Sequence, residues 1–469
     1  MKHEEILTAL EEIDDKFIKE AEMPPKKRTY LKIAVAAVFI LAILFVPKVI
    51  APHMVVEASE PRISEYPDSD IYEDRGQWES AYEAWKAEMD SRSEISTQAM
   101  LGLDSFFAEG NNQFLLTEKN ENRIWSPVNA YIGLAMMTEL TEGETRQQIL
   151  DVFGVEETDV LREQVSAVWE SVYQDDSKEV CVLANSLWLE KGLQYNPKAV
   201  DALAYHYYAS VYQGDLSSEK MNKEIASWID SNTGNFLNNS TKNIQLSSDI
   251  IMALYSTLYF QATWSNEFLE RNNTEDVFHT IDEEVQVVYM NKELEYMNYY
   301  WGENFGAVNM WLKNGCRMWI ILPDEGMTTT DVLNDDAYIE MLLSDEWEAC
   351  KYLKVNLSIP KFDVSSNTDL STGFKNMGVT NVFNEDTAEF TKLTWDLPIY
   401  LTGANQSVRV EIDEEGVKAA TYIEFPGAGA EGAPAEDEII DFVVDRPFLF
   451  VINKENIPLF AGCVNNPEN

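Results

Sequence analysis

The clearest alternation of apolar and polar positions lies close to the C-terminus. From residue 417 to 425, every second residue is small or apolar, which is the period of a strand with one buried face. That face would carry Val417, Ala419, Thr421, Ile423 and Phe425. Gly, Ala and Pro dominate the next stretch, 426–434, as is typical of exposed turns and loops. The pattern predicts a strand-forming segment attached to an exposed loop. On this segment alone, an ordinary strand-turn-strand remains an equal alternative.

A second pattern is the uninterrupted apolar run over 33–46, which follows the basic triplet Lys26-Lys27-Arg28. Counted over 31–50, the run is long enough to cross a bilayer. The basic residues before it place the N-terminus in the cytoplasm. We therefore expect a cytoplasmic segment over 1–30 and a single transmembrane anchor over 31–50, with the remainder extracellular at the cell membrane. The alternative is a cleaved signal and a secreted protein, but the polar start is long for a signal peptide.

The next residues read as a linker. Pro, Glu and Asp are frequent over 51–75, which favours a solvated spacer. Trp78, Tyr82 and Trp85 then recur at helical spacing and predict a short helix, packed either on the domain or beside the membrane. Another helical pattern begins at Ser96. We therefore expect an acidic linker with a short helix over 51–94 and one large domain over 95–469.

Motifs along this domain resemble those of the serpin family, in the family's order. Each motif is weak alone, but together they are specific. They are Ser126-Pro127, Gly143-Glu144-Thr145, Ala184-Asn185-Ser186-Leu187-Trp188, Asn222 with Trp228-Ile229, Tyr259-Phe260 with Trp264, Ile359-Pro360-Lys361-Phe362, Arg446-Pro447-Phe448-Leu449-Phe450 and Phe460-Ala461-Gly462-Cys463. The resemblance implies an α+β serpin fold, with helices packed around a large central, mostly antiparallel sheet and smaller sheets, and an exposed reactive-centre loop.

The resemblance also assigns the loop residues. The proximal hinge would consist of Glu414, Glu415, Gly416, Val417, Ala419, Ala420 and Thr421. The family's spacing from the hinge glycine implies a reactive bond between Ala430 and Glu431. The loop is longer than usual, and we place the extra residues after that bond, at 435–438. Alanine before the bond suits the shallow primary pocket of elastase-like and subtilisin-like serine proteases.

Polar residues beneath the sheet form a further expected set. The family's shutter and breach would here be Ser126, Asn129, Ser256, Trp264 and Gln406. Gln406 stands where the family usually has His, and Asn129 and Ser256 stand where it usually has Ser and Asn. We expect Asn129, Ser256 and Gln406 to form one buried hydrogen-bond network, in which donors and acceptors remain matched.

Composition excludes several classes of partner. The net charge of −46 over 469 residues disfavours nucleic acid and heparin-type polyanions, because phosphate and sulfate groups are bound by Lys and Arg. Four widely spaced cysteines, without a CxxC pair, are expected to be free thiols and not a metal site. They are Cys181, Cys316, Cys350 and Cys463. No cofactor or metal is expected.

Enzyme motifs are also missing from the sequence. Of the four histidines, His206 and His279 fall in the expected domain and stand apart from each other. Neither belongs to an HExxH motif, and the chain has no GxSxG elbow. We therefore expect no catalytic residues. The resemblance implies an inhibitor whose target supplies the nucleophile: the cleaved loop inserts into the sheet and distorts the protease.

A non-inhibitory binding module, cleaved without trapping, is the alternative function. Tyr422, Ile423 and Phe425 are bulkier than the family's usual small residues, and added volume is resisted in a close-packed sheet. Pro426 would also remove one ladder donor. Val417 is neither charged nor a proline, so it favours insertion of the loop into the sheet and hence inhibition.

Overall fold

The structure is a computed structural model. It describes residues 54–60, 67, 72, 74–116, 121–176, 179–237, 241–242, 244–344, 347–417 and 438–468. The chain divides into two compact units, Met1–Met54 and Val55–Asn469, and the second is considered below. The predicted anchor at 31–50 lies outside the described residues. Within the described part, no helix has both the length and the apolar character needed to span a bilayer.

The helices begin and end at residues that match local sequence signals. Pro127 occupies the first turn of α4, where its missing N–H is not needed, and the Ser218 side chain accepts from the Met221 N–H to cap α8. The α-helices are α3 (Arg75–Phe114), α4 (Pro127–Leu140), α5 (Gly143–Val152), α6 (Thr158–Val172), α7 (Pro197–His206), α8 (Glu219–Asn232), α10 (Thr329–Leu333), α11 (Asp336–Leu343) and α12 (Ser371–Asn376).

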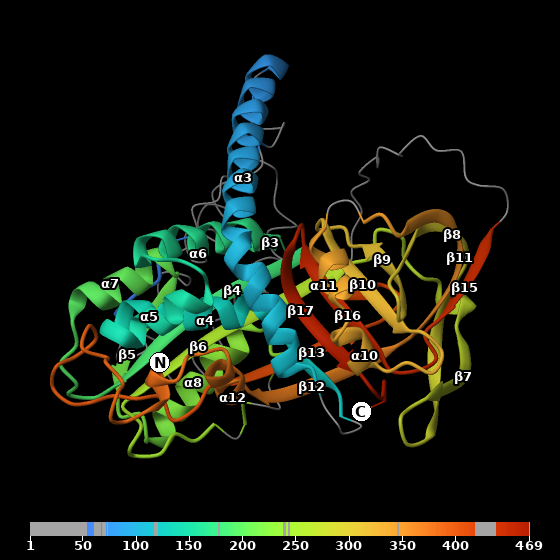
Figure 1. Ribbon diagram of the computed structural model, residues 1–469. Coiled ribbons are helices and arrows are strands. Elements are labelled where there is room, and N and C mark those ends of the chain that lie inside the picture. The colour runs from blue at the N-terminus through green and yellow to red at the C-terminus, as the bar shows by residue number, and fades with distance from the viewer. Residues whose placement is uncertain are drawn as a thin grey trace, which may run out of the picture. The chain divides into compact units, whose positions relative to one another are not determined.

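Strands of the six-stranded sheet follow the order β1-β5-β4-β6-β14, with β3 beside β4. They are β1 (Met54–Val56), β3 (Gln174–Asp176), β4 (Glu179–Glu190), β5 (Ala209–Gly214), β6 (Met252–Thr263) and β14 (Gly416–Val417). β6 pairs antiparallel with residues 180–189 of β4, whereas β5 is parallel to β4. This sheet lies with α4 to α8 on the left of Figure 1.

The second sheet has nine strands in the order β15-β11-β8-β9-β10-β16-β17-β2, with β7 beside β8. They are β2 (Arg123–Trp125), β7 (Thr274–His279), β8 (Glu284–Trp301), β9 (Phe305–Trp311), β10 (Cys316–Pro323), β11 (Cys350–Pro360), β15 (Ile439–Val443), β16 (Phe448–Lys454) and β17 (Ile457–Val464). A separate antiparallel pair consists of β12 (Phe362–Asp369) and β13 (Asn405–Ile412). The α+β fold, with helices around mostly antiparallel sheets, is confirmed.

Helix α4 connects these layers. Every residue of α4 except Gly133 is buried. It contacts β6 of the six-stranded sheet and β17 of the nine-stranded sheet. Because the buried side chains, most of them apolar, surround the helix and do not occupy one face only, it belongs inside the core. The helix thus lies between the six-stranded and the nine-stranded sheet and contacts both.

The N-terminal boundary of the domain differs from the expectation. Val55 and Val56, in the expected solvated spacer, belong to β1 and pack against the core, and the Ser59 N–H donates to the Ala204 carbonyl at 3.0 Å. The short helix expected over 77–89 is the first part of α3, which continues without a break to Phe114. A boundary at 95 therefore falls inside one helix. Backbone pairing of a three-residue strand leaves no periodic signal in the sequence.

Candidate functional site

The strands β6 and β13 face each other without pairing. In the described structure, β6 pairs with β4 on one side and with the two residues of β14 on the other, whereas β13 pairs only with β12. Between them is a cavity of about 60 Å³. It is lined by residues 256–260 of β6, 407–411 of β13, Ser126 and Asn129 of the α4 start, Thr233, Phe236 and Leu237 after α8, and Val417, Ile452 and Phe460. We call this space the β6–β13 gap.

The predicted hinge begins to fill one end of this gap. Gly416 pairs with Thr263 and Val417 with Ala262, antiparallel to β6. Gly416 has φ +143°, and a Cβ there would lie 2.4 Å from the Ala262 carbonyl oxygen, so only glycine fits. Val417 is buried, with 6% of its surface exposed. The first alternating residue of the sequence pattern thus already occupies a strand position with its side chain inside.

The acidic turn before the hinge is held by several contacts. Trp264 binds the backbone of this turn twice. Its backbone N–H donates to the Glu415 carbonyl at 3.0 Å, and its indole Nε1 donates to the Asp413 carbonyl at 2.9 Å. Glu414 pairs with Lys361 at 2.5 Å and accepts from Asn273. Burial would raise the pKa of Glu414, but hydrogen bonds from Lys361 and Asn273 outweigh it and lower that pKa.

Polar residues at the start of α4 reach both sides of the gap. The Asn129 amide donates to the Ser256 carbonyl at 3.0 Å, and the Ser256 hydroxyl donates back to Asn129 Oδ1. Gln406 of β13 brackets Ser126: its Oε1 accepts from the Ser126 N–H at 2.8 Å, and its Nε2 donates to the Ser126 carbonyl at 3.0 Å. The Ser126 hydroxyl donates to the Leu459 carbonyl at 2.7 Å.

These hydrogen bonds differ in one respect from the expected single network. The side chains form two pairs, Asn129 with Ser256 and Gln406 with the Ser126 backbone, joined through the first turn of α4. A glutamine amide can donate and accept at once, so it satisfies the backbone of Ser126 without reaching Asn129. One pair therefore ties α4 to β6, and the other ties α4 to β13.

Other predicted loop residues lie outside the described structure. They are Ala419, Ala420, Thr421, Ala430 and Glu431. The chain is described again from Glu438, which pairs with Lys351, and continues into β15 at the edge of the nine-stranded sheet. The stems of the loop thus belong to two different sheets.

Sequence reasoning missed two residues that line the gap, Arg409 and Phe236. The Arg409 guanidinium lies 4.2 Å from the centre of the Phe236 ring. The alternation in β13 puts Arg409 on the face opposite buried Val408 and Val410, which is a signal that its side chain projects from the strand. Nothing in the sequence indicates Phe236 as its partner.

Catalytic and metal chemistry find no support in the described part of the chain. No group of three or more His, Cys, Asp or Glu residues there could hold a metal ion. The exposed side chain of His279, at the end of β7, lies 3.6 Å from that of Glu284, at the start of β8. The four cysteines are unpaired, and burial raises the pKa of Cys181 to about 12 and of Cys463 to about 11. Thiols held protonated in this way are poor nucleophiles.

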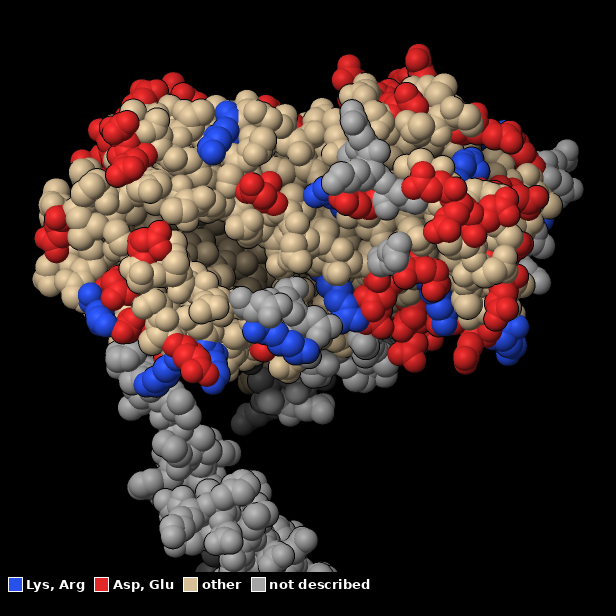
Figure 2. Space-filling model, turned by 90° about the horizontal axis from the view of Figure 1, so that it is seen from below, with Lys and Arg blue, Asp and Glu red and all other residues tan. Residues whose placement is uncertain are grey.

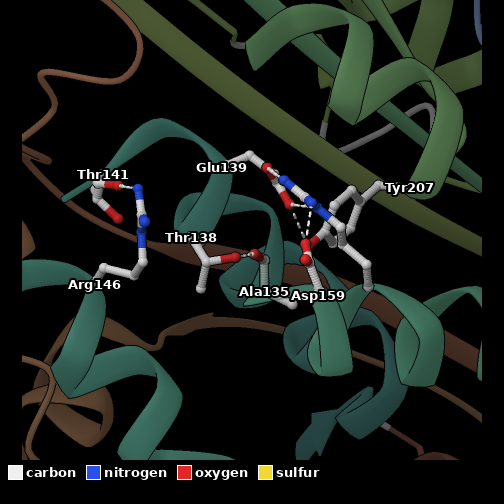
Figure 3. Close-up of polar contacts among 8 residues, drawn as sticks. Ala135, Thr138, Glu139, Thr141, Arg146, Asp159 and Tyr207 are labelled. Carbon is white, nitrogen blue, oxygen red and sulfur yellow. Dashed lines mark hydrogen bonds and ion pairs between the residues drawn. The ribbon is translucent and has the colours of Figure 1, made fainter. Parts of the chain in front are cut away.

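A charged cluster lies at the opposite end of α4. Glu139 is buried and receives two hydrogen bonds of 2.6 Å from Arg162 of α6, which also pairs with Asp159. The Tyr207 hydroxyl donates to Glu139 at 3.1 Å, and the side chains of Glu139, Asp159 and Tyr207 converge in Figure 3. The pKa of Arg162 is raised, chiefly by the hydrogen bond with Glu139. With every group paired, the cluster fastens helices and offers no free acid or base.

Surface charge is unevenly distributed over the face shown in Figure 2. Asp and Glu side chains gather on the right half of that view, whereas the left half has a hollow among uncharged residues. The β7–β8 hairpin also exposes several acidic side chains, namely Glu275, Asp276, Asp282, Glu283 and Glu284. A dense negative surface repels polyanions.

Comparisons with known proteins agree on the family. Residues 104–467 match the family model described as Serpin (serine protease inhibitor). The chain is 25% identical to human Serpin B4 over 81% of this chain and 100% of that protein, and 27% identical to Serpin-ZX of Arabidopsis thaliana over 81% and 100%. The native-state crystal structure of tengpin, a thermophilic serpin, covers 88% of this chain and 100% of its own, at 22% identity and TM-score 0.67. Together with the fold, these matches show that the chain belongs to the serpin family, whose members are in general protease inhibitors and not enzymes.

Proposed function

We propose that this protein traps serine proteases by inserting its cleaved loop into the β6–β13 gap. The observation that carries the proposal is β14, because the first two loop residues already pair with β6 at the mouth of an otherwise unfilled space. Strand addition would supply ladder hydrogen bonds on both sides and bury the alternating apolar face. Membership of the serpin family supports an inhibitory function in general.

The pairing of β14 also sets the register of insertion. Extended along β6, the same antiparallel register would bring Ile423 opposite Ser256 and Gly427 opposite Met252, where β6 ends. Residues opposite each other on neighbouring strands share a face. Ile423 would therefore face the Asn129–Ser256 pair at the start of α4. The insertable length ends three positions before Ala430, so a protease acylated there would be drawn to the far end of β6.

The target class rests on the loop sequence. Ala430 before the proposed bond, with Glu431 after it, suits elastase-like or subtilisin-like proteases that have shallow primary pockets. The apolar run over 31–50, with basic residues before it, supports a membrane anchor with a cytoplasmic N-terminus. We thus place the inhibitory domain outside the cell, tethered to its membrane.

Incubation with pancreatic elastase and with subtilisin tests the proposal. A heat-stable, high-mass band on a denaturing gel is expected, together with a released C-terminal peptide that starts at Glu431 in mass spectrometry. Cleavage without the high-mass band would instead support the non-inhibitory binding module. Ala430→Arg serves as the matched specificity variant: it should abolish elastase trapping and create trypsin trapping, since the trypsin pocket carries a carboxylate.

A further inference from the structure

The segment just before β13 exposes three large apolar side chains. Trp395 is 75% exposed, and Leu397 and Tyr400 are each 39% exposed. We call residues 394–401 the apolar loop; its one acidic residue is Asp396, in a chain that has 81 acidic residues. The loop lies at the left of Figure 1, near β5 and α7. Large apolar side chains gathered on one exposed loop indicate a contact surface.

Hydrogen bonds hold the backbone of this loop on both sides of Trp395. The Thr394 hydroxyl donates to the Gln194 carbonyl at 2.5 Å, and the Asp396 carboxylate accepts from the Gln194 N–H at 3.0 Å. Both bonds go to one residue of the turn that follows β4. Trp395 is therefore held outward by a fixed backbone, which reduces the entropy that the loop would lose on binding.

The chain enters the domain at the same end of the six-stranded sheet. The Ala58 N–H donates to the Ser210 hydroxyl at 3.2 Å, near the start of β5. Because β1 pairs with β5, it starts at the Gly214 end of β5 and runs toward Ser210. The Gly214 carbonyl accepts from the Lys191 N–H at 2.7 Å, in the turn after β4. β1 therefore begins beside the turn that holds the apolar loop.

The short chain before β1 limits how far this end can lie from a bilayer. Five residues lead from Ile50, the end of the expected anchor, to Val55, which packs against the core. Fully extended, they span at most about 18 Å. Trp and Tyr favour the membrane interface, because each has an apolar ring and a group that can hydrogen-bond. The apolar loop carries one of each.

We propose that the apolar loop is a membrane-docking surface, whose Trp395, Leu397 and Tyr400 side chains enter the lipid interface beside the anchor. This inference rests on the proposed function only in taking 31–50 as a membrane anchor. The hinge pairs with the opposite end of β6, so docking turns the hinge away from the bilayer, toward an approaching protease. A protease drawn to the far end of β6 would displace the loop from the lipid, so docking belongs to the uncleaved protein.

Hydroxyl-radical footprinting of the full-length chain in phosphatidylcholine vesicles tests the docking. Trp311 of β9 is the matched reference: it is 53% exposed, and its carbonyl accepts from the Ser265 N–H just beyond the hinge end of β6. Exposure within the domain alone would make Trp395 oxidise faster than Trp311. On the membrane, mass spectrometry should show Trp395 oxidised at least fivefold more slowly. A Trp395 rate equal to or above that of Trp311 would overturn the proposal.

Two variants and a dilution identify what covers the loop. Leu397→Asp puts a charge on an exposed position, so the fold should persist while Trp395 oxidation in vesicles rises at least threefold. Ile439→Asp is the matched control, since Ile439 of β15 is also an exposed large apolar residue but lies in the nine-stranded sheet; it should leave Trp395 protected. Protection that disappears at fewer than one protein per vesicle would mean that a second copy covers the loop, which would overturn docking on lipid.

Extraction of the vesicles with alkaline carbonate separates the docking from the anchor. Protein that stays with the vesicles while its Trp395 oxidises freely would keep the anchor and reject the docking. Protein that is extracted in alkali, but whose Trp395 is protected on vesicles at neutral pH, would keep the docking and reject the anchor. Extraction together with free oxidation would reject both.

Discussion

The two ends of α4 use polar side chains in opposite ways. At its start, Ser126 and Asn129 make neutral hydrogen bonds to β13 and β6, the two strands that do not pair with each other. At its end, Glu139 forms a buried ion pair with Arg162 of α6 and accepts from Tyr207. Neutral hydrogen bonds exchange at modest net cost, whereas separating a buried ion pair costs several kcal/mol. The comparison teaches that α4 is fixed at one end and adaptable at the end that faces the gap.

The largest effect is expected from breaking the fixed end. Glu139→Ala should lower the free energy of unfolding by about 3 kcal/mol, because it leaves the Arg162 guanidinium without its main partner. Urea unfolding followed by circular dichroism measures the loss. The double variant Glu139→Ala/Arg162→Met should recover part of it, since the only charge that then loses its partner is Asp159, whose side chain is exposed. A loss below about 1 kcal/mol would show that the pair behaves like an exposed one.

A charge at the mouth of the gap tests the adaptable region. Val417→Arg would bury an unpaired charge beside Ala262, which costs far more than burying a neutral polar group. Since β14 is only two residues long, the hinge should leave the sheet and the domain should stay folded. We expect cleavage by elastase without a gel-stable complex. Val417→Thr is the size-matched control and should still trap. Undiminished trapping by Val417→Arg would rule out insertion through this hinge.

Breaking the Asn129–Ser256 pair should lower the stability less than breaking the Glu139–Arg162 ion pair. Asn129→Ala removes the bonds to Ser256 and leaves its half-buried hydroxyl without an acceptor, which costs about 1 kcal/mol. Because this pair ties α4 to β6 beside the gap, the variant should also polymerise or insert its own loop on mild heating. Thermal melting and native gels measure both effects. An unchanged melting temperature and the absence of polymers would mean that the Asn129–Ser256 pair does not hold α4 to β6.

The smallest effect concerns pH at the hinge turn. The pKa of Glu414 is lowered in the folded protein from its usual 4.5. The unfolded chain therefore binds its proton first as pH falls, and the contribution of Glu414 is present above pH 4.5 and lost as pH passes below the folded pKa. Glu414→Gln should be less stable than the parent at pH 7, and their melting temperatures should converge in acid. A difference that persists at pH 3 would indicate a steric cause.

Short-range patterns determined much of this protein. The alternation of Val408, Val410 and Ile412 made β13 a strand with one buried face, and these side chains are buried. Gly416 was assigned to the hinge from the family resemblance, and the structure gives the reason for glycine there: its positive φ and its approach to Ala262 exclude a side chain. The order of family motifs, each carried by a few adjacent residues, was sufficient for the fold class. Periodicity and turn chemistry depend on neighbours in sequence, so they can be read without the structure.

Only the tertiary structure decided which distant residues meet. Asn129 and Ser256 are 127 positions apart, and Arg409 and Phe236 are 173 apart. The pairing of Glu139 with Arg162 depends on how α6 packs on α4, and the place of β1 depends on a free edge at β5. Such contacts follow from the packing of whole elements, for which one sequence carries no local signal. The sequence therefore determined the elements and the hinge, and the packing decided that β6 and β13 would stand apart with a cavity between them.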